Sequence, residues 1–285
     1  MGVTQSASLS LLPLLIAHEL GYFRAEGLAL DWVPMVSEAD GAAALNKGEL
    51  QFLVSDFVYA LTGVARGFDW KAIAFPSRTP QVVFGVLPRS VSSYRHLSDL
   101  KGRRVCTLPS SLTSQLLISQ LKQGAGLAPS DISIVSLNDP LDALLQVRLG
   151  NMDALCMDHA MVAALEQRGE LKVIVDTRTS QGAQDGFGGP MPGSAVCASA
   201  QFVQQRAESC QALAHAVARA LRWLRTAGPS DLVRALSNVT LDTDLVYYLA
   251  ALEKSRDGFL GDGVMPDAAA HTGLRALNRH ESRHV

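Results

Sequence analysis

The stretch Gly48-Glu-Leu-Gln-Phe-Leu-Val-Ser-Asp56 is echoed by Gly150-Asn-Met-Asp-Ala-Leu-Cys-Met-Asp158, which starts 102 residues further along the chain. Each copy begins with a glycine, passes through a polar turn and runs through a short apolar segment to an aspartate. A helix-like segment follows each copy, over residues 57–64 and 159–167. Self-similarity at a fixed offset predicts that the chain contains two copies of one structural unit.

The repeat continues outward from these segments. In each copy an amphipathic helix ends at a Gly-Leu pair, Gly27-Leu28 in the first and Gly126-Leu127 in the second. Glycine suits the left-handed position that ends a helix, and a strand is expected after each pair, over residues 29–34 and 132–137. Each copy is therefore predicted to read strand, helix, strand, helix, strand. This alternation is typical of parallel βαβ units and predicts an α/β protein with two lobes.

The second copy is predicted to be inserted into the first lobe. Further strands are expected at residues 71–75, 81–87 and 194–198, and helical periodicity runs from 201 to 226. The Gly/Pro-rich stretch Gly182–Gly193 predicts a loop or hinge, because such a composition disfavours a helix. Lobe I is expected to comprise residues 1–84 and 190–285, and lobe II residues 85–189. Two segments then cross between the lobes, as in proteins that close on a ligand.

Composition limits the possible partners. The 285 residues are 48% hydrophobic and carry a formal net charge of −2, which indicates a packed globular chain and gives no reason to expect nucleic acid or a membrane surface. No apolar run reaches the roughly 20 residues that span a bilayer. The four cysteines, Cys106, Cys156, Cys197 and Cys210, lack metal-site spacing. The first three lie in apolar strand-like runs and are expected to be buried free thiols.

Polar residues gather where the predicted strands end, which is where open α/β sheets bind ligands. Two hydroxyl-rich helix starts are expected there, because free N–H groups and the helix dipole favour acceptor atoms of a ligand. The two aspartates that close the repeated segments are expected there as well. Helix capping is the alternative role for these side chains. The candidates are Gln5, Ser6, Ser8, Ser55, Asp56, Thr107, Ser110, Ser111, Thr113, Ser114 and Asp158.

Charged candidates point to two different ligand classes. Asp56 and Asp158 are expected to face each other across a cleft, where they would suit an amine, ligand N–H groups or a closing contact between the lobes. At least one of the two should be solvated or paired. Arg78 follows a strand of the first lobe and is a candidate anchor for a carboxylate or sulfonate. Arg178 is a weaker candidate of the same kind. A solvated loop arginine is the alternative for both.

Catalytic patterns are scarce. The sequence contains no GxSxG, no GxxxxGK[ST] and no GxGxxG at a strand end, and no histidine pair with metal spacing lies within a predicted helix. We therefore expect a protein without catalytic residues, cofactor or metal.

Four segments in a fixed order resemble a known family. They are Pro13–Leu28 (PLLIAHELGYFRAEGL), Ala44–Val54 (ALNKGELQFLV), Leu97–Val105 (LSDLKGRRV) and Leu149–Leu155 (LGNMDAL). Together they are similar to the solute-binding proteins of ABC transporters of the sulfonate/nitrate/taurine and thiamine-precursor type. The resemblance implies a type 2 periplasmic-binding-protein fold, with a mostly parallel sheet flanked by helices in each lobe. It also implies ligand contacts from the strand-end segments named above.

Two features depart from the family pattern. His159 stands where the family often has proline, and the first residues show no basic leader or cleavage site. The protein is thus expected to be periplasmic if a leader precedes Met1, and cytoplasmic if Met1 is the native start. A fungal-type branch of the family makes the thiamine pyrimidine and carries a cysteine-rich signature, which this chain lacks.

The expected function is capture of a small polar molecule between two closing lobes, by a monomer that hands it transiently to a transporter permease. The ligand is expected to be a sulfonate, a carboxylate or a pyrimidine-like molecule. Two alternatives remain open: a cytoplasmic enzyme of cofactor or pyrimidine biosynthesis on the same scaffold, and a cytoplasmic ligand-sensing domain.

Overall fold

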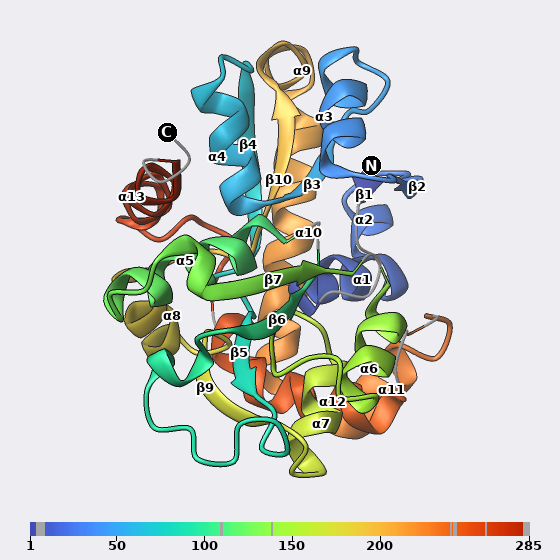
Figure 1. Cartoon of the computed structure of the whole chain (residues 1–285). Helices are drawn as coiled ribbons and strands as arrows, with labels where there is room; N and C mark the ends of the chain where they lie inside the picture. Colours follow the sequence, from blue (N-terminus) through green and yellow to red (C-terminus); the bar gives the residue numbers. More distant parts are fainter. Residues whose placement is uncertain are drawn as a thin grey trace.

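The computed structural model describes residues 1–3, 9–108, 111–137, 139–239, 241, 244–259 and 261–281. Its strands form two five-stranded sheets (Figure 1). The first sheet has the order β2 (Val33–Pro34), β1 (Gly2–Val3), β3 (Leu53–Asp56), β10 (Ser194–Ser199) and β4 (Trp70–Ser77). The second has the order β7 (Ile132–Ser136), β6 (Arg103–Thr107), β8 (Ala154–Met157), β5 (Val83–Val86) and β9 (Lys172–Asp176).

The two sheets share one topology, which confirms the predicted repeat. In the first sheet β1 pairs in parallel with β2 and β3, and in the second β6 pairs in parallel with β7 and β8. The fourth strand is antiparallel to both neighbours in each sheet: β10 in the first and β5 in the second. The chain passes between the sheets from β4 to β5 and again from β9 to β10. These are the two crossing segments expected of a hinge.

The glycines of the repeat stand where the pattern requires them. Gly48 and Gly150 follow the helices that precede β3 and β8, and both adopt left-handed φ angles, of 77° and 80°. Only glycine adopts this conformation without a steric cost, so both copies end the helix in the same way.

Helices cover the faces of both sheets. The first copy contributes α1 (Leu12–Glu19), α2 (Tyr22–Ala25), α3 (Glu38–Asn46) and α4 (Phe57–Ala65). The second contributes α5 (Leu112–Gly124), α6 (Pro140–Arg148), α7 (Met161–Gln167) and α8 (Ser180–Phe187). The C-terminal part adds α9 (Ala200–Gln205), α10 (Ala207–Thr226), α11 (Pro229–Ala235), α12 (Leu245–Ser255) and α13 (Ala269–Glu281). Short 3-10 turns are η1 (Leu9–Leu11), η2 (Leu97–Leu100), η3 (Pro129–Asp131) and η4 (Arg256–Phe259).

The long amphipathic helix α10 anchors the core of the first lobe. It packs against α1, α2 and β4, and buries Leu213, Val217 and Leu221. Each such side chain stabilises the fold by about 1.5–3 kcal/mol when fully buried. The predicted periodicity over residues 201–226 is interrupted at Arg206, which separates α9 from α10.

The prediction of a loop over Gly182–Gly193 is wrong in its first half, because α8 spans Ser180–Phe187. Thr179 caps this helix by accepting a hydrogen bond from the Gly182 N–H at 3.0 Å. A Cβ at Gly182 would lie 1.7 Å from the Asp176 carbonyl oxygen, so glycine is needed for the helix to pack against the end of β9. Close packing thus outweighs the intrinsic cost of about 1 kcal/mol per helical glycine.

The C-terminal helices contact both halves of the molecule. Helix α12 packs against α7, the helix that follows β8 and precedes β9 along the chain. Helix α13 packs against both α4 and α5. Strand β5 belongs to the second sheet, and the predicted boundary at 84/85 falls within this strand. The lobe boundaries at 84/85 and 189/190 stay a prediction. No helix in the described residues combines the length and hydropathy that crossing a bilayer requires.

Candidate functional site

Asp56 ends β3 and caps the helix that follows it. Its Oδ1 accepts hydrogen bonds from the N–H groups of Val58 at 2.8 Å and Tyr59 at 3.2 Å. The capping role that the sequence left open for Asp56 is therefore real. The cap uses one carboxylate oxygen and leaves the other to face outward from the strand end.

The second oxygen of Asp56 joins the two halves of the molecule. The Thr113 hydroxyl donates to Asp56 Oδ2 at 2.8 Å, and the Thr113 N–H lies 3.4 Å from the same oxygen. Thr113 is in the first turn of α5, the helix that follows β6 of the second sheet. The strand-end surfaces of the two repeats thus face and touch each other, as the sequence predicted.

A buried glutamate that the sequence analysis missed supports this strand end. Glu38 lies in the first turn of α3 and accepts from the Ser55 hydroxyl at 2.7 Å and from the Asp56 N–H at 2.9 Å. Glu38 is 8% exposed and Ser55 is 1% exposed. No sequence pattern pointed to Glu38, because an acidic residue in a first helical turn usually only complements the helix dipole. Its role is to position Ser55 and the backbone of Asp56.

The pKa of Asp56 is raised although its carboxylate accepts several hydrogen bonds. The pKa of Asp56 is raised to about 6, mainly by burial and also by the charge of Asp158, although the Thr113 hydroxyl and the helix N–H groups lower it. Asp158 directly follows β8, at the position equivalent to Asp56 in the other repeat. The two carboxylates therefore act on one another, as expected from the repeat. The groups that lower the pKa of Asp56 are neutral donors: the Thr113 hydroxyl and the N–H groups of Val58 and Tyr59.

Ser111 and Ser114 form a capping pair at the start of α5. Ser111 Oγ accepts from the Ser114 N–H at 3.2 Å, and the two hydroxyl oxygens lie 2.6 Å apart. Thr107 is fully buried at the end of β6. These three side chains satisfy helix and strand ends, so their ligand contacts remain a prediction. His159 has a similar local role, because its Nδ1 accepts from the Met161 N–H at 3.1 Å.

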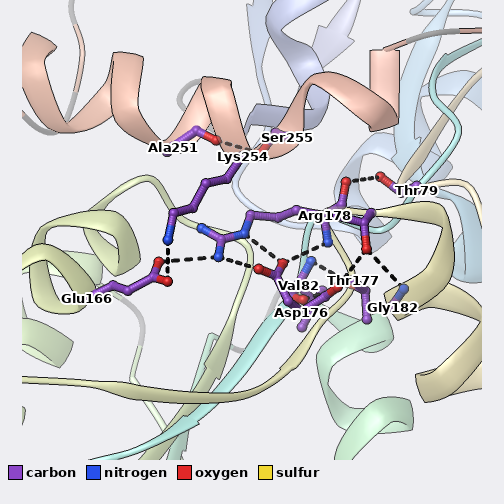
Figure 2. A network of polar contacts seen from close by, with 11 residues as sticks. Thr79, Val82, Glu166, Asp176, Thr177, Arg178, Gly182, Ala251, Lys254 and Ser255 are labelled. Carbon is purple, nitrogen blue, oxygen red and sulfur yellow. Dashed lines mark hydrogen bonds and ion pairs between the residues drawn. The ribbon is translucent and has the colours of Figure 1, made fainter. Parts of the chain in front are cut away.

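The two arginine candidates differ sharply. Arg78 follows β4 and is exposed; its backbone N–H donates to the Gly258 carbonyl, and its guanidinium has no hydrogen bond or ion pair among the described residues. Arg178 is 2% exposed and is held by Asp176 and Glu166, as Figure 2 shows. Arg178 is therefore engaged structurally, and only Arg78 remains available as an anion anchor.

Four of the candidates, Gln5, Ser6, Ser8 and Ser110, lie outside the described residues. Among the described residues there is no group of three or more side chains suited to hold a metal ion. All four cysteines are buried and free, which was predicted for Cys106, Cys156 and Cys197. Burial raises the pKa of Cys106 to about 11 and of Cys197 to about 12.

A family model described as "NMT1/THI5 like" matches residues 9–228. The chain belongs to this family. A solved structure of a protein from Bordetella bronchiseptica RB50 is 31% identical, with a TM-score of 0.85 over 98% of this chain and 87% of that chain. A search of curated proteins finds no match.

Two further solved structures similar to this chain are of binding proteins. The alkanesulfonate-binding protein SsuA from Xanthomonas axonopodis pv. citri, bound to MOPS, is 17% identical, with a TM-score of 0.73 over 99% of this chain and 92% of that chain. The periplasmic nitrate-binding protein NrtA from Synechocystis PCC 6803 is 15% identical, with a TM-score of 0.70 over 98% and 80%. At these identities the likeness shows the fold, which is the two-lobed periplasmic-binding-protein fold. The family resemblance read from the sequence is confirmed.

Proposed function

We propose that this protein is the solute-binding component of an ABC importer. It binds a small polar molecule in the cleft between its two lobes and passes it to a membrane permease. The observation that carries the proposal is the hydrogen bond from Thr113 to Asp56, because it joins the strand-end surfaces of two separate sheets. Family membership and the likeness to sulfonate-binding and nitrate-binding proteins support it.

The mechanism follows from the two-lobed arrangement. The segments β4–β5 and β9–β10 act as the hinge, and opening the hinge separates Asp56 from Thr113. A ligand that contacts both surfaces favours the closed population by its differential affinity for that form. Asp56 and Asp158 would accept N–H groups of the ligand, while Arg78 and the hydroxyl-rich start of α5 would hold an acceptor-rich group. We propose that the protein acts as a monomer in the periplasm, without cofactor or catalytic residue.

A thermal-shift screen tests this proposal. One set of compounds contains sulfonates and carboxylates, and the other contains aminopyrimidines and amines. We expect a compound from at least one set to raise the melting temperature, and small-angle scattering to show compaction with that compound. The Asp56→Asn variant should lose the response to cationic compounds and keep more of the response to anions. Arg78→Gln should do the reverse.

The rival is an enzyme on the same scaffold. It predicts conversion of a bound compound, which mass spectrometry of the incubated mixture would detect. Conversion of the ligand, or a bound ligand that causes no compaction, would overturn the solute-binding proposal.

A further inference from the structure

A groove with a volume of about 460 Å³ lies on the side of the molecule where α13 meets the second lobe. Figure 1 shows α13 beside α4, with α5 and α8 below it. The groove, called here the α13 groove, is lined by η2 and the segment before it, by α5 and α8, and by α13. Its size lies within the range of small-molecule sites, roughly 300–1,000 Å³.

The floor of the α13 groove is apolar. Leu97 and Phe187 are buried, and Leu121, Ile174 and the ring of Tyr94 are partly buried beside them. Burial of this surface by a hydrocarbon or aromatic group would be favourable, because it removes apolar area from water. A ligand of this groove therefore has an apolar body.

The rim of the groove carries two arginines from one face of α13. Arg275 and Arg279 are four residues apart, and like charges at this spacing destabilise a helix. Arg275 Nη2 donates to the carbonyl oxygens of Phe187 at 3.1 Å and Gly188 at 2.8 Å, which fixes it at the C-terminal end of α8. Neither arginine forms an ion pair with a carboxylate in the described part of the chain. The one acidic residue of the lining, Asp185, accepts a hydrogen bond from Gln181 at 2.8 Å.

From these observations we propose that the α13 groove is a second binding site, separate from the inter-lobe cleft, for a small monoanion with an aromatic or alkyl body. The anionic group pairs with Arg279 and with the guanidinium nitrogens of Arg275 that do not contact α8. Guanidinium suits this role, because it presents several donors in one plane to an oxyanion.

The site is connected to the hinge motion through α13. Gly273 of this helix lies against Leu61 and Phe57 of α4, where an added Cβ would come within 2.5 Å and 3.3 Å of the two side chains. Phe57 directly follows Asp56 of the cleft. The same helix contacts α5 of the second lobe. A ligand that fixes α13 to α8 therefore favours the arrangement in which the lobes stay together, and this consequence rests on the proposed function.

Fluorine NMR with 4-fluorobenzoate tests the site directly, with the neutral 4-fluorobenzamide as the comparison compound. We expect the anion to bind the wild-type chain at millimolar concentrations, and the amide to bind at least fivefold more weakly. Arg279→Gln should weaken binding of the anion about threefold to fivefold, as an exposed ion pair does. Arg225→Gln, which changes an exposed arginine of α10, should have no effect.

A cleft variant separates this proposal from the proposed function. Asp56→Asn should change binding of 4-fluorobenzoate less than Arg279→Gln does. If Asp56→Asn alters that binding and Arg279→Gln does not, the anion occupies the cleft, and the α13 groove proposal fails while the cleft proposal stands. Equal binding of anion and amide, or no binding of either, also overturns it. Arg275→Gln is the less decisive variant, because it loosens the contact of α13 with α8.

Small-angle scattering tests the coupling. Saturating 4-fluorobenzoate should reduce the radius of gyration relative to 4-fluorobenzamide, and Arg279→Gln should abolish the difference. An unchanged radius with confirmed groove binding would show that the site exists but does not act on the hinge.

Discussion

Two carboxylate clusters in this molecule are built in opposite ways. At the end of β3, Asp56 is held by a hydroxyl and two backbone N–H groups, and its pKa is raised to about 6. At the end of β9, Asp176 is held by the guanidinium of Arg178, which also reaches Glu166, and Lys254 of α12 pairs with the same glutamate (Figure 2). The contacts described for Asp56 come from neutral groups, whereas Asp176 and Glu166 contact cations.

The two clusters differ in how the charge of their carboxylates is balanced. In the Arg178 cluster each carboxylate has a cation, and the cluster ties α12 to α7 and β9, so it stabilises one arrangement of the chain. Hydroxyl and N–H donors at Asp56 do not neutralise its charge, and Asp158 adds to the repulsion. The ligand role of Asp56 stays a proposal, and the raised pKa that supports it is a property that functional sites often share.

The largest expected effect is that of Arg178→Gln. This variant leaves Asp176 and Glu166 without the buried guanidinium, and breaking a buried pair from one side costs about 3 kcal/mol of unfolding free energy. Urea denaturation measures the change. Arg168→Gln is the matched control, since Arg168 is exposed and its guanidinium donates to the neutral Tyr247 hydroxyl. A loss below about 1 kcal/mol would mean that the cluster does not hold α12, α7 and β9 together.

Asp56→Asn gives the next effect, and its size depends on pH. The pKa of Asp56 is about 6 in the folded chain and near 3.8 in the unfolded chain, so the folded state binds the additional proton between these values. The contribution of Asp56 to stability therefore falls as pH rises from about 4 to about 6. Relative to wild type, Asp56→Asn should gain up to about 3 kcal/mol of unfolding free energy across that window and no more above about pH 7.

Thermal denaturation from pH 4 to pH 8 measures this difference. Asn remains a good helix cap, so the comparison isolates the charge. Asp139→Asn, which changes an exposed carboxylate that caps α6, is the control. A difference between Asp56→Asn and wild type that does not vary with pH would contradict the raised pKa.

Thr113→Val tests the link between the lobes. It removes the hydroxyl that donates to Asp56 and keeps the shape of the side chain, so it should cost about 1 kcal/mol of the closed form, or about a fivefold shift toward open. Distances between spin labels on the two lobes report this shift. Thr62→Val removes a hydroxyl that bonds only within α4 and should leave the distances unchanged.

The smallest effect is expected at the edge of the Arg178 cluster. Lys254→Met removes a half-exposed cation from Glu166, and such a pair contributes about 0.5 kcal/mol. Denaturation in 0.05 M and 0.5 M salt should show a loss that shrinks at the higher concentration. A loss as large as that of Arg178→Gln would mean that Lys254, and not Arg178, is the principal cation of the cluster.

Much of the fold followed from local pattern. The repeated Gly-to-Asp segments specified β3 and β8, and the Gly-Leu pairs marked the helix ends correctly, because glycine at a left-handed position is a local requirement. The family assignment came from the same segments. The sequence also indicated that Asp56 and Asp158 would oppose each other, since equivalent positions of two facing repeats must meet.

Tertiary contacts decided what local pattern could not. Helix α8 forms over glycines that composition alone assigned to a loop, because Gly182 must approach the end of β9 more closely than any side chain allows. Arg178 and Arg78 have similar strand-end settings in the sequence, yet only the fold brings Glu166 to Arg178 and leaves Arg78 exposed. Periodicity and turn chemistry act within a few residues and are written in the sequence, whereas burial and charge pairing depend on which distant segments the fold brings together.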